Sequence, residues 1–220
     1  MSNKIAWSEL YARRREAERA FGPIFRVPIR RRVRDVVLEN VHDGDSVLEV
    51  GAGDRRYRDT LSAKRRELRY ESMDIDTRTR HDHADLSQIA GVYDCVFALE
   101  VVEHLPLDDL PAWLGRLNEL LREGGRLVLS TPNTFYPPAY LRDVTHRTPL
   151  CYDEMAALVA LAGMRPEAIY RIHHERWPRA VLQRFVFGWL FRLIGIDFAR
   201  QIALVARKPA RREAEKAAGD

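Results

Sequence analysis

Residues 47–53 constrain this chain of 220 residues more than any other stretch. An apolar strand fills its first positions and runs directly into a Gly-x-Gly turn at Gly51, Ala52 and Gly53. Such apolar runs are typical of a strand that is buried on both faces. The glycines allow a sharp turn and keep side chains away from a ligand. We therefore predict a nucleotide-like ligand here, with polar groups that satisfy Glu49, a carboxylate that is costly to bury alone.

Downstream of this turn, segments with the pattern of strands alternate with segments with the pattern of helices. Strands are predicted at residues 46–50, about 68–74, 93–99, 126–130, about 167–173 and 201–207. Helices are predicted between them at about 55–65, 107–122 and 153–162. This alternation favours an α/β fold with a mostly parallel sheet that carries helices on both faces.

The first 41 residues are predicted to form an N-terminal helical segment. Ser8 can cap a helix over Glu9–Phe21, and valines at helical spacing predict a second helix from about Pro28 to Val41. The arginines of this second helix either meet a phosphate of a ligand or form a solvated basic face. They are Arg30, Arg31, Arg32 and Arg34.

The remaining chain is predicted to be one domain with a tail. Residues 42–208 form the domain, because a chain with 46% hydrophobic residues can bury one sizeable core. The strongly apolar residues at about 176–199 are interpreted as a helical insertion before the last strand. Residues 209–220 are rich in charge, and we predict that they are disordered.

The length of the apolar segments, the N-terminus, the cysteine content and the net charge each bear on the class of protein. The apolar segments are too short for a membrane span, and the N-terminus turns polar too early for a secretory signal. The two cysteines give neither a disulfide framework nor the spacing of metal ligands. These features predict a cytoplasmic protein. The net charge of +4 is compatible with nucleic acid, but the sequence shows no binding module or aromatic–basic stripe that supports such an acceptor.

Acidic residues follow several of the predicted strands. Asp74 ends the strand after the glycine turn, Asp85 precedes the next strand, and Glu100 directly follows the strand at 93–99. In an open parallel sheet, ligands bind at the carboxyl ends of the strands, where a carboxylate can accept hydrogen bonds from ribose hydroxyls. Each residue taken singly is also compatible with a solvated loop carboxylate, but their order along the chain favours a shared site.

Six segments together resemble the motifs of class I S-adenosylmethionine-dependent methyltransferases. They are Leu48–Gly53, Met73–Asp76, Asp85–Leu86, Tyr93–Phe97, Glu100–Leu105 and Leu121–Leu127. The resemblance covers roughly residues 25–207 and is closest to small bacterial enzymes of the ubiquinone-pathway and sugar O-methyltransferase type. A nicotinamide oxidoreductase is the alternative from another class, but it would need a third glycine where this chain has Arg56.

The resemblance implies a Rossmann-like, seven-stranded, mostly parallel sheet whose last strand, Gln201–Arg207, runs antiparallel. It also implies S-adenosylmethionine as the cofactor. The residues implied to bind it are Glu49, Gly51, Ala52, Gly53, Asp74, Ile75, Asp85, Leu86, Leu99 and Glu100. Among these, the position of Asp85 matches the family's ligand for the adenine amino group.

An alcohol acceptor must lose a proton when it is methylated, and two arrangements meet this need. In the first, His146 is a general base that Asp143 orients. In the second, an E-x-x-E-H array with a later histidine resembles the Mg²⁺ site of some RNA 2′-O-methyltransferases and quinone O-methyltransferases. Its members are Glu100, Glu103, His104 and His146. The array is equally compatible with a structural turn, and we predict no metal as the default.

The predicted activity is methylation of an oxygen on a small-molecule or lipid-linked acceptor, such as a sugar hydroxyl or glycolipid. The alternatives are a phenol or quinone O-methyltransferase, or a non-catalytic partner protein that binds S-adenosylmethionine. The apolar residues 184–196 either contact the inner membrane surface peripherally, cap the acceptor pocket or form a dimer face. The sequence predicts no particular oligomeric state.

Overall fold

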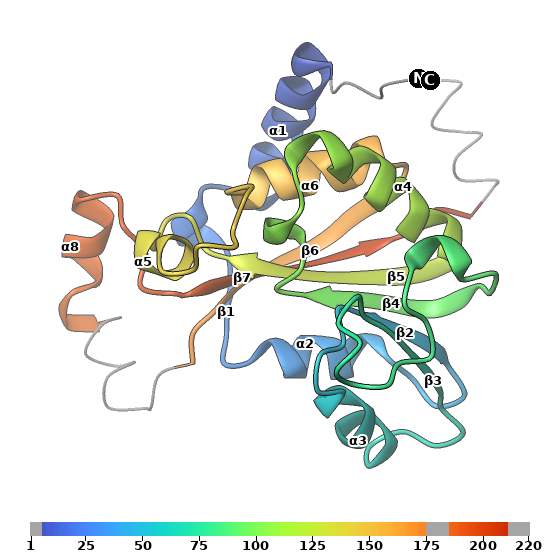
Figure 1. Ribbon diagram of the computed structural model, residues 1–220. Coiled ribbons are helices and arrows are strands. Elements are labelled where there is room, and N and C mark those ends of the chain that lie inside the picture. The colour runs from blue at the N-terminus through green and yellow to red at the C-terminus, as the bar shows by residue number, and fades with distance from the viewer. Residues whose placement is uncertain (1–5, 175–184, 211–220) are drawn as a thin grey trace.

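A computed structural model describes residues 6–174 and 185–210 of the chain. It contains one seven-stranded sheet in the order β1-β6-β7-β5-β4-β2-β3 (Figure 1). The strands are β1 (Ile29–Arg30), β2 (Ser46–Val50), β3 (Arg69–Met73), β4 (Tyr93–Leu99), β5 (Leu121–Pro132), β6 (Arg165–Ile172) and β7 (Gln201–Arg207). Among them, β7 runs antiparallel to both of its neighbours, and the other pairs are parallel. The predicted Rossmann-like α/β fold is confirmed.

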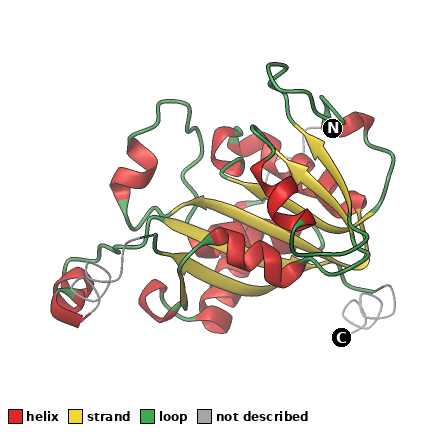
Figure 2. Ribbon diagram, turned by 90° about the horizontal axis from the view of Figure 1, so that it is seen from below, coloured by secondary structure: helices red, strands yellow, loops and turns green. Residues whose placement is uncertain are grey.

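Helices cover both faces of the sheet. The described helices are α1 (Trp7–Phe21), α2 (Val33–Asn40), α3 (Arg56–Ser62), α4 (Leu110–Leu120), α5 (Pro137–Leu141), α6 (Tyr152–Leu161) and α8 (Gly188–Leu193). Helices α1, α4 and α6 lie on one face, and α2 and α3 lie on the other (Figure 1). Figure 2 shows the twist of the strands between these two layers. None of the described helices is long and apolar enough to cross a membrane.

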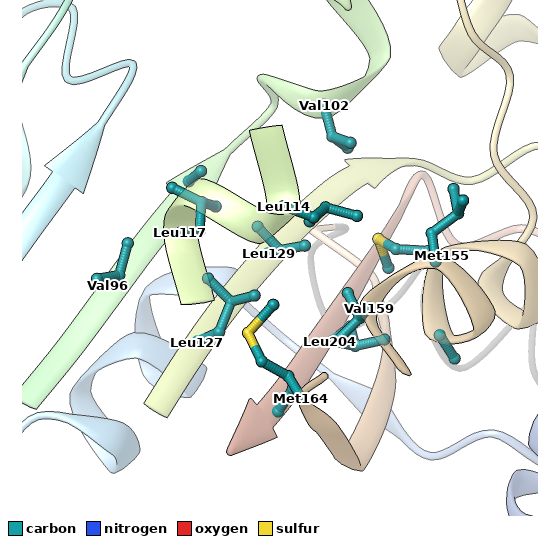
Figure 3. Close-up of a cluster of buried hydrophobic side chains, with 14 of the residues drawn as sticks. Val96, Val102, Leu114, Leu117, Leu127, Leu129, Met155, Val159, Met164 and Leu204 are labelled. Carbon is teal, nitrogen blue, oxygen red and sulfur yellow. The ribbon is translucent and has the colours of Figure 1, made fainter. Parts of the chain in front are cut away.

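The two faces of the sheet bury separate hydrophobic cores because successive strand residues point to opposite sides. Leu48 and Val96 join the core under α4 and α6, part of which is shown in Figure 3. Val47 and Phe97, one residue away on the same strands, join the core under α2 and α3. All four side chains are fully buried. The apolar run in β2 is therefore explained by burial on both faces.

The N-terminal helix was predicted well, except for its cap. Helix α1 begins at Trp7, after an Ala6 N-cap that makes no side-chain hydrogen bond, so Ser8 lies inside the first turn. It ends at Phe21 as expected, because Gly22 adopts a φ of 73°. The helix packs on α6, where Arg14 Nε donates to Asp153 Oδ2 at 2.8 Å.

The second predicted helix, from about Pro28 to Val41, is wrong in its first part. Residues Ile29 and Arg30 form strand β1 at the edge of the sheet, and helix α2 begins only at Val33. The backbone N–H groups of Arg171 and His173 donate to the carbonyls of Pro28 and Arg30 at 2.8 and 2.9 Å. Pairing with this open edge of β6 replaces the first helical turn and provides the seventh strand, which no local sequence pattern predicts.

The predicted set of arginines is divided by this change. Arg30 lies on β1, Arg31 and Arg32 lie in the link, and Arg34 lies on α2. Arg30 pairs with Glu39 at 3.1 Å, and its guanidinium stacks over Tyr170 at 5.0 Å from the ring centre. These contacts favour the solvated basic face over a phosphate site.

Strand β5 and the loop that follows it also differ from the predictions. Strand β5 begins at Leu121 instead of 126, and an irregular register between Tyr93 and Cys95 of β4 accommodates Gly124 and Gly125 within the strand. The loop after β5 contains the short helix α5. Residues 176–184 of the predicted insertion and 211–220 of the predicted tail lie outside the described part of the chain, and the division at residue 41 stays a prediction.

A buried ion pair joins four segments beside the outer strands. Arg171 Nη1 on β6 lies 2.9 Å from Asp197 Oδ1, and both side chains are almost fully buried. Arg171 also donates to the carbonyl of Val27 before β1. Asp197 accepts from Asn133 Nδ2 and from the backbone N–H of Phe198. Since every contact is a charge-assisted hydrogen bond, the removal of one partner leaves the other charge buried without compensation.

We expect Arg171→Met to lower the free energy of unfolding by about 3–5 kcal/mol, because Asp197 would stay buried without its cation. Urea unfolding followed by circular dichroism measures this loss. Arg13→Met is the matched control, since its partner Glu16 is solvent-exposed and such pairs contribute less than about 1 kcal/mol. Equal unfolding free energies for the two variants would contradict the structural role of the buried pair.

Candidate functional site

The glycine turn lies where the strand order of the sheet reverses. Strand β2 pairs with β3 on one side and with β4 on the other, and chain connections leave it in both directions. Gly51 has a φ of 73°, and a Cβ at this position would lie 2.3 Å from Cγ2 of Val101. The N–H groups of Gly51 and Ala52 both donate to the carbonyl of Met73. The turn therefore requires glycine and is held against β3.

A cavity of about 510 Å³, which we call the turn cavity, opens at the end of β2. Six of the ten residues predicted to bind the cofactor line it: Glu49, Gly51, Ala52, Gly53, Leu99 and Glu100. Its other lining residues are Val33, Asp54, Arg56, Tyr57, Ser130, His174 and Gln201. The structure thus gathers the glycine turn and the end of β4 around one space, and cofactor binding by these six residues stays a prediction.

Glu49 is a buried carboxylate at the wall of the turn cavity, with 4% of its surface exposed. Burial raises its pKa to about 7, although a hydrogen bond from the Tyr70 hydroxyl and the charges of Arg56 and Arg55 act in the opposite direction. Near neutral pH the group therefore exchanges between carboxylate and carboxylic acid. A cationic group in the cavity would favour the ionised form.

The other four predicted cofactor residues lie outside the turn cavity. Asp74 Oδ2 accepts from the N–H of Gly53 at 2.7 Å, so this carboxylate braces the glycine turn. Ile75 is 82% exposed. Asp85 is exposed and accepts from the backbone N–H of Ser87, and Leu86 is buried in the core. Their contacts with a cofactor remain predictions.

Asp82 is a bracing residue that the sequence did not reveal. Its Oδ2 accepts from the backbone N–H and the hydroxyl of Ser72, both at 2.8 Å, and pairs with Arg55 at 3.2 Å. Arg55 itself adopts a left-handed φ of 59° directly before α3. The network joins the glycine loop to β3. No local pattern around Asp82 signalled it, because its partners come from two distant segments.

A second cavity of about 450 Å³, which we call the loop cavity, lies under the loop that follows β5. It is lined by Glu100, Pro132, Tyr136, Pro138, Ala139, Arg142, His174, Arg200 and Gln201. Glu100, His174 and Gln201 line both cavities. They follow β4, follow β6 and begin β7, respectively. The start of β7 lies beside the ends of β4 and β6 because β7 is antiparallel. The predicted antiparallel direction of this strand is the signal that could have revealed His174 and Gln201.

Glu100 occupies a strained position at this junction. Its φ is 56°, a left-handed value that is uncommon for a residue with a side chain. Burial raises the pKa of its carboxyl group, while the Ser130 hydroxyl donates to Oε1 at 2.8 Å and lowers it. The side chain therefore presents a poorly solvated carboxylate to both cavities.

His146 and Asp143 were predicted as a base and its orienting partner. The Nε2 atom of His146 lies 3.9 Å from Asp143 Oδ2, which is longer than a hydrogen bond. Its Nδ1 lies 2.7 Å from the carbonyl of Tyr140, so Nδ1 carries the hydrogen. Neither residue lines the two cavities. The catalytic role of this pair remains a prediction.

His146 instead groups with Glu103 and His104. Potential ligand atoms of these three residues all lie within 4.8 Å of one another, and Glu100 is outside the group. Glu103 is fully buried, neither of its carboxylate oxygens has a hydrogen-bond partner among the described residues, and burial followed by the charge of Glu100 raises its pKa to about 8.

Two imidazoles and one carboxylate do not suit Mg²⁺, the alternative considered from the sequence, because this ion prefers oxygen ligands and usually retains several waters. The group of Glu103, His104 and His146 offers a single carboxylate. The fourth predicted ligand, Glu100, accepts from Ser130 instead. The residues present therefore do not fit a Mg²⁺ site.

Comparison with known proteins agrees with this geometry. Similar solved structures include an S-adenosylmethionine-dependent methyltransferase from Archaeoglobus fulgidus, with 16% identity and a TM-score of 0.60 over 80% of this chain and 90% of that chain. Another from Mesorhizobium loti has 12% identity and a TM-score of 0.59 over 79% and 95%. The cyclopropane synthase MmaA2 from Mycobacterium tuberculosis has 12% identity and a TM-score of 0.57 over 94% and 100%. At these identities the similarity establishes the fold alone.

No curated protein matches the chain. A family model described as a methyltransferase domain matches residues 22–185, which is more than half of the sequence. This range includes the glycine turn, both cavity walls from β2 and β4, and the loop after β5. The chain therefore belongs to the methyltransferase domain family, and it has the fold of S-adenosylmethionine-dependent methyltransferases.

Proposed function

We propose that this enzyme transfers the methyl group of S-adenosylmethionine to an oxygen of a small-molecule or lipid-linked acceptor, such as a sugar hydroxyl. The observation that carries the proposal is the junction of two cavities at Glu100, His174 and Gln201. A cofactor in the turn cavity and an acceptor in the loop cavity would meet there. Methyl transfer needs mainly this alignment and the exclusion of water.

The cofactor would rest on the glycine turn. The backbone at Gly51–Gly53 leaves room for close approach, and Glu49 offers a carboxylate to the ammonium group of the cofactor. We retain Asp74 with Ile75 as the ribose contact and Asp85 with Leu86 as the adenine contact. Asp74 can brace the glycine turn and also contact the ribose. Its oxygens have further lone pairs beyond those that accept from the backbone N–H groups of Gly53 and Asp76.

The loop cavity supports an acceptor that is partly apolar and partly anionic. Tyr136, Pro138 and Ala139 provide apolar surface, whereas the guanidinium groups of Arg142 and Arg200 suit a phosphate or carboxylate. A lipid-linked sugar phosphate combines both properties. A phenol or quinone, the alternative acceptor, would use the apolar wall alone.

The apolar residues at 185–194 support peripheral contact with the inner membrane surface. Helix α8 lies at the periphery of the molecule (Figure 1), and its Trp189 and Leu193 are 67% and 74% exposed. Residues 185–196 include no acidic side chain. Arg192 and Arg26 line a small cavity of about 180 Å³ at the base of this helix, where lipid phosphates could bind.

We expect the purified enzyme to move label from methyl-labelled S-adenosylmethionine to one member of a panel of lipid-linked sugar phosphates, free sugars, phenols and quinols. Gly51→Ala should reduce product at least about tenfold, because its Cβ meets Val101 at a φ that disfavours alanine. Gly115→Ala is the matched control, since no atom lies within 4 Å of the added Cβ. Cofactor binding without product from any acceptor would contradict the proposal.

We also expect cofactor affinity to depend on pH through Glu49. Its pKa of about 7 means that the carboxyl group is mostly protonated at about pH 6, and binding of an ammonium group must then release this proton. Affinity for S-adenosylmethionine in calorimetry should therefore rise about eightfold between roughly pH 6 and 7.5. In Glu49→Gln the affinity should be lower and flat over this interval. A wild-type profile that is equally flat would remove Glu49 from the ammonium site.

Membrane contact predicts that the enzyme sediments with vesicles that contain phosphatidylglycerol. The double variant Trp189→Ser/Leu193→Ser should reduce the bound fraction at least about fivefold, since burial of each large apolar side chain contributes about 1.5–3 kcal/mol. Trp7→Ser on α1 is the matched control, because Trp7 is 58% exposed and lies on another helix. A dimer in light scattering that the double variant abolishes would show that the surface is a dimer face instead.

A further inference from the structure

We propose that His174 is the catalytic base that takes the proton from the acceptor hydroxyl, at a site formed with Gln201 and Glu100. The inference deepens the proposed function and rests on it. The three residues line both the turn cavity and the loop cavity. A methyl group that moves between ligands in these cavities must pass beside them, so a base at this boundary lies next to the reacting oxygen.

The backbone brings His174 to this boundary from a distant segment. It follows β6 by two positions, and Gln201 is the first residue of β7. Because β7 is antiparallel to β5 and β6, its first residue lies at the edge where β4 and β6 end. Ile172 pairs with Gln201 across the sheet. The register of the sheet therefore brings the backbone at the end of β6 beside Gln201, two residues before His174.

One hydrogen bond determines which nitrogen of the neutral His174 ring carries the hydrogen. Nε2 lies 2.6 Å from Oε1 of Gln201. An amide oxygen only accepts, so in this orientation Nε2 carries the hydrogen and Nδ1 retains its lone pair. Among the described residues, Nδ1 has no hydrogen-bond partner. A neutral imidazole with one fixed N–H and one available lone pair is the form that a general base requires.

The charged groups around the ring complete the site. Burial raises the pKa of the Glu100 carboxyl group, whereas the charges of His146 and His174 both lower it. The attraction between this carboxylate and the His174 ring would stabilise the imidazolium that forms after proton transfer. Arg142 and Arg200 also line the loop cavity and oppose this effect. We assign them to an anionic part of the acceptor, which would neutralise them when it binds.

His146, the base predicted from the sequence, has a different environment. Its Nδ1 donates to the Tyr140 carbonyl, and its ring packs edge-on against His104 with 4.9 Å between the ring centres. One of its ring nitrogens lies within 4.8 Å of potential ligand atoms of Glu103 and His104. Since His146 lines neither cavity, the geometry favours His174 for contact with the acceptor.

The resulting step balances without another reactant. A lone pair of the acceptor oxygen forms the new O–CH₃ bond as the S–CH₃ bond breaks and its electron pair returns to sulfur, which gives S-adenosylhomocysteine. The hydroxyl proton moves to Nδ1 of His174. The ring is exposed at the surface of the described chain, so the imidazolium can release this proton to water.

Nuclear magnetic resonance of the full chain with ¹⁵N-labelled histidine tests the position of His174 before any acceptor is known. The probes are S-adenosylmethionine and S-adenosylhomocysteine, which differ by one methyl group and the sulfonium charge. Resonances are assigned with His174→Asn and His146→Asn. At the pH where half of the His174 rings are protonated in the S-adenosylhomocysteine complex, S-adenosylmethionine should lower the protonated fraction by about threefold or more, because like charges repel at short range.

The outcomes of this experiment are distinguishable. A His174 ring that responds equally to both ligands, although calorimetry shows that both bind, would overturn the inference and leave the proposed function intact. A response of His146 that is larger than that of His174 would return the base to His146. If neither ligand binds, the proposed function fails and the inference fails with it.

Kinetics with an acceptor that the panel identifies separates a base from a structural residue. His174→Asn should lower kcat at least about 100-fold, change the affinity for S-adenosylmethionine less than about threefold, and abolish the fall of kcat at low pH. If His146 is the base, His146→Asn would show this pattern instead. Retention of the acidic limb of the kcat profile in His174→Asn would contradict our assignment.

Discussion

The left-handed turn at Gly51 is the constraint on which the site depends. Its φ of 73° and the contact that any Cβ would make with Val101 exclude other residues, and the Met73 carbonyl holds the turn through two N–H groups. Asp74 fixes the next glycine through the N–H of Gly53. The turn ends β2 abruptly, which leaves the turn cavity open beside the end of β4 and gives a ligand direct access to the backbone.

Poorly solvated carboxylates give this site its electrostatic character. Glu49 is buried and lines the turn cavity, Glu100 is half-buried and lines both cavities, and Glu103 is buried but lines neither. All three have raised pKa values, mainly because burial removes water from their charged forms. The chain as a whole is basic, with a net charge of +4. These three acids nevertheless lie close to the ends of β2 and β4. A cofactor with an ammonium and a sulfonium group would compensate for the negative charges of the carboxylates that line the cavities.

The sequence predicted what local patterns determine. Strands β4 and β7 have the predicted bounds, because burial on both faces makes their residues apolar throughout. Six of the residues predicted to bind the cofactor line the turn cavity, because they adjoin the glycine turn or the end of β4. Their contacts with a cofactor stay a prediction. Strand β1 was missed, since two residues carry no periodicity and pair only because β6 offers an edge. His174 was missed because sheet register, not spacing, brings it to Gln201.

Calorimetric titration of the full chain with S-adenosylhomocysteine tests the central claim most directly, because this ligand needs no acceptor and undergoes no reaction. We expect saturable heat with one ligand bound per chain, and no heat with NAD under the same conditions. A folded protein that gives no heat with either S-adenosylhomocysteine or S-adenosylmethionine would contradict the account, since the turn at the end of β2 would then hold no cofactor.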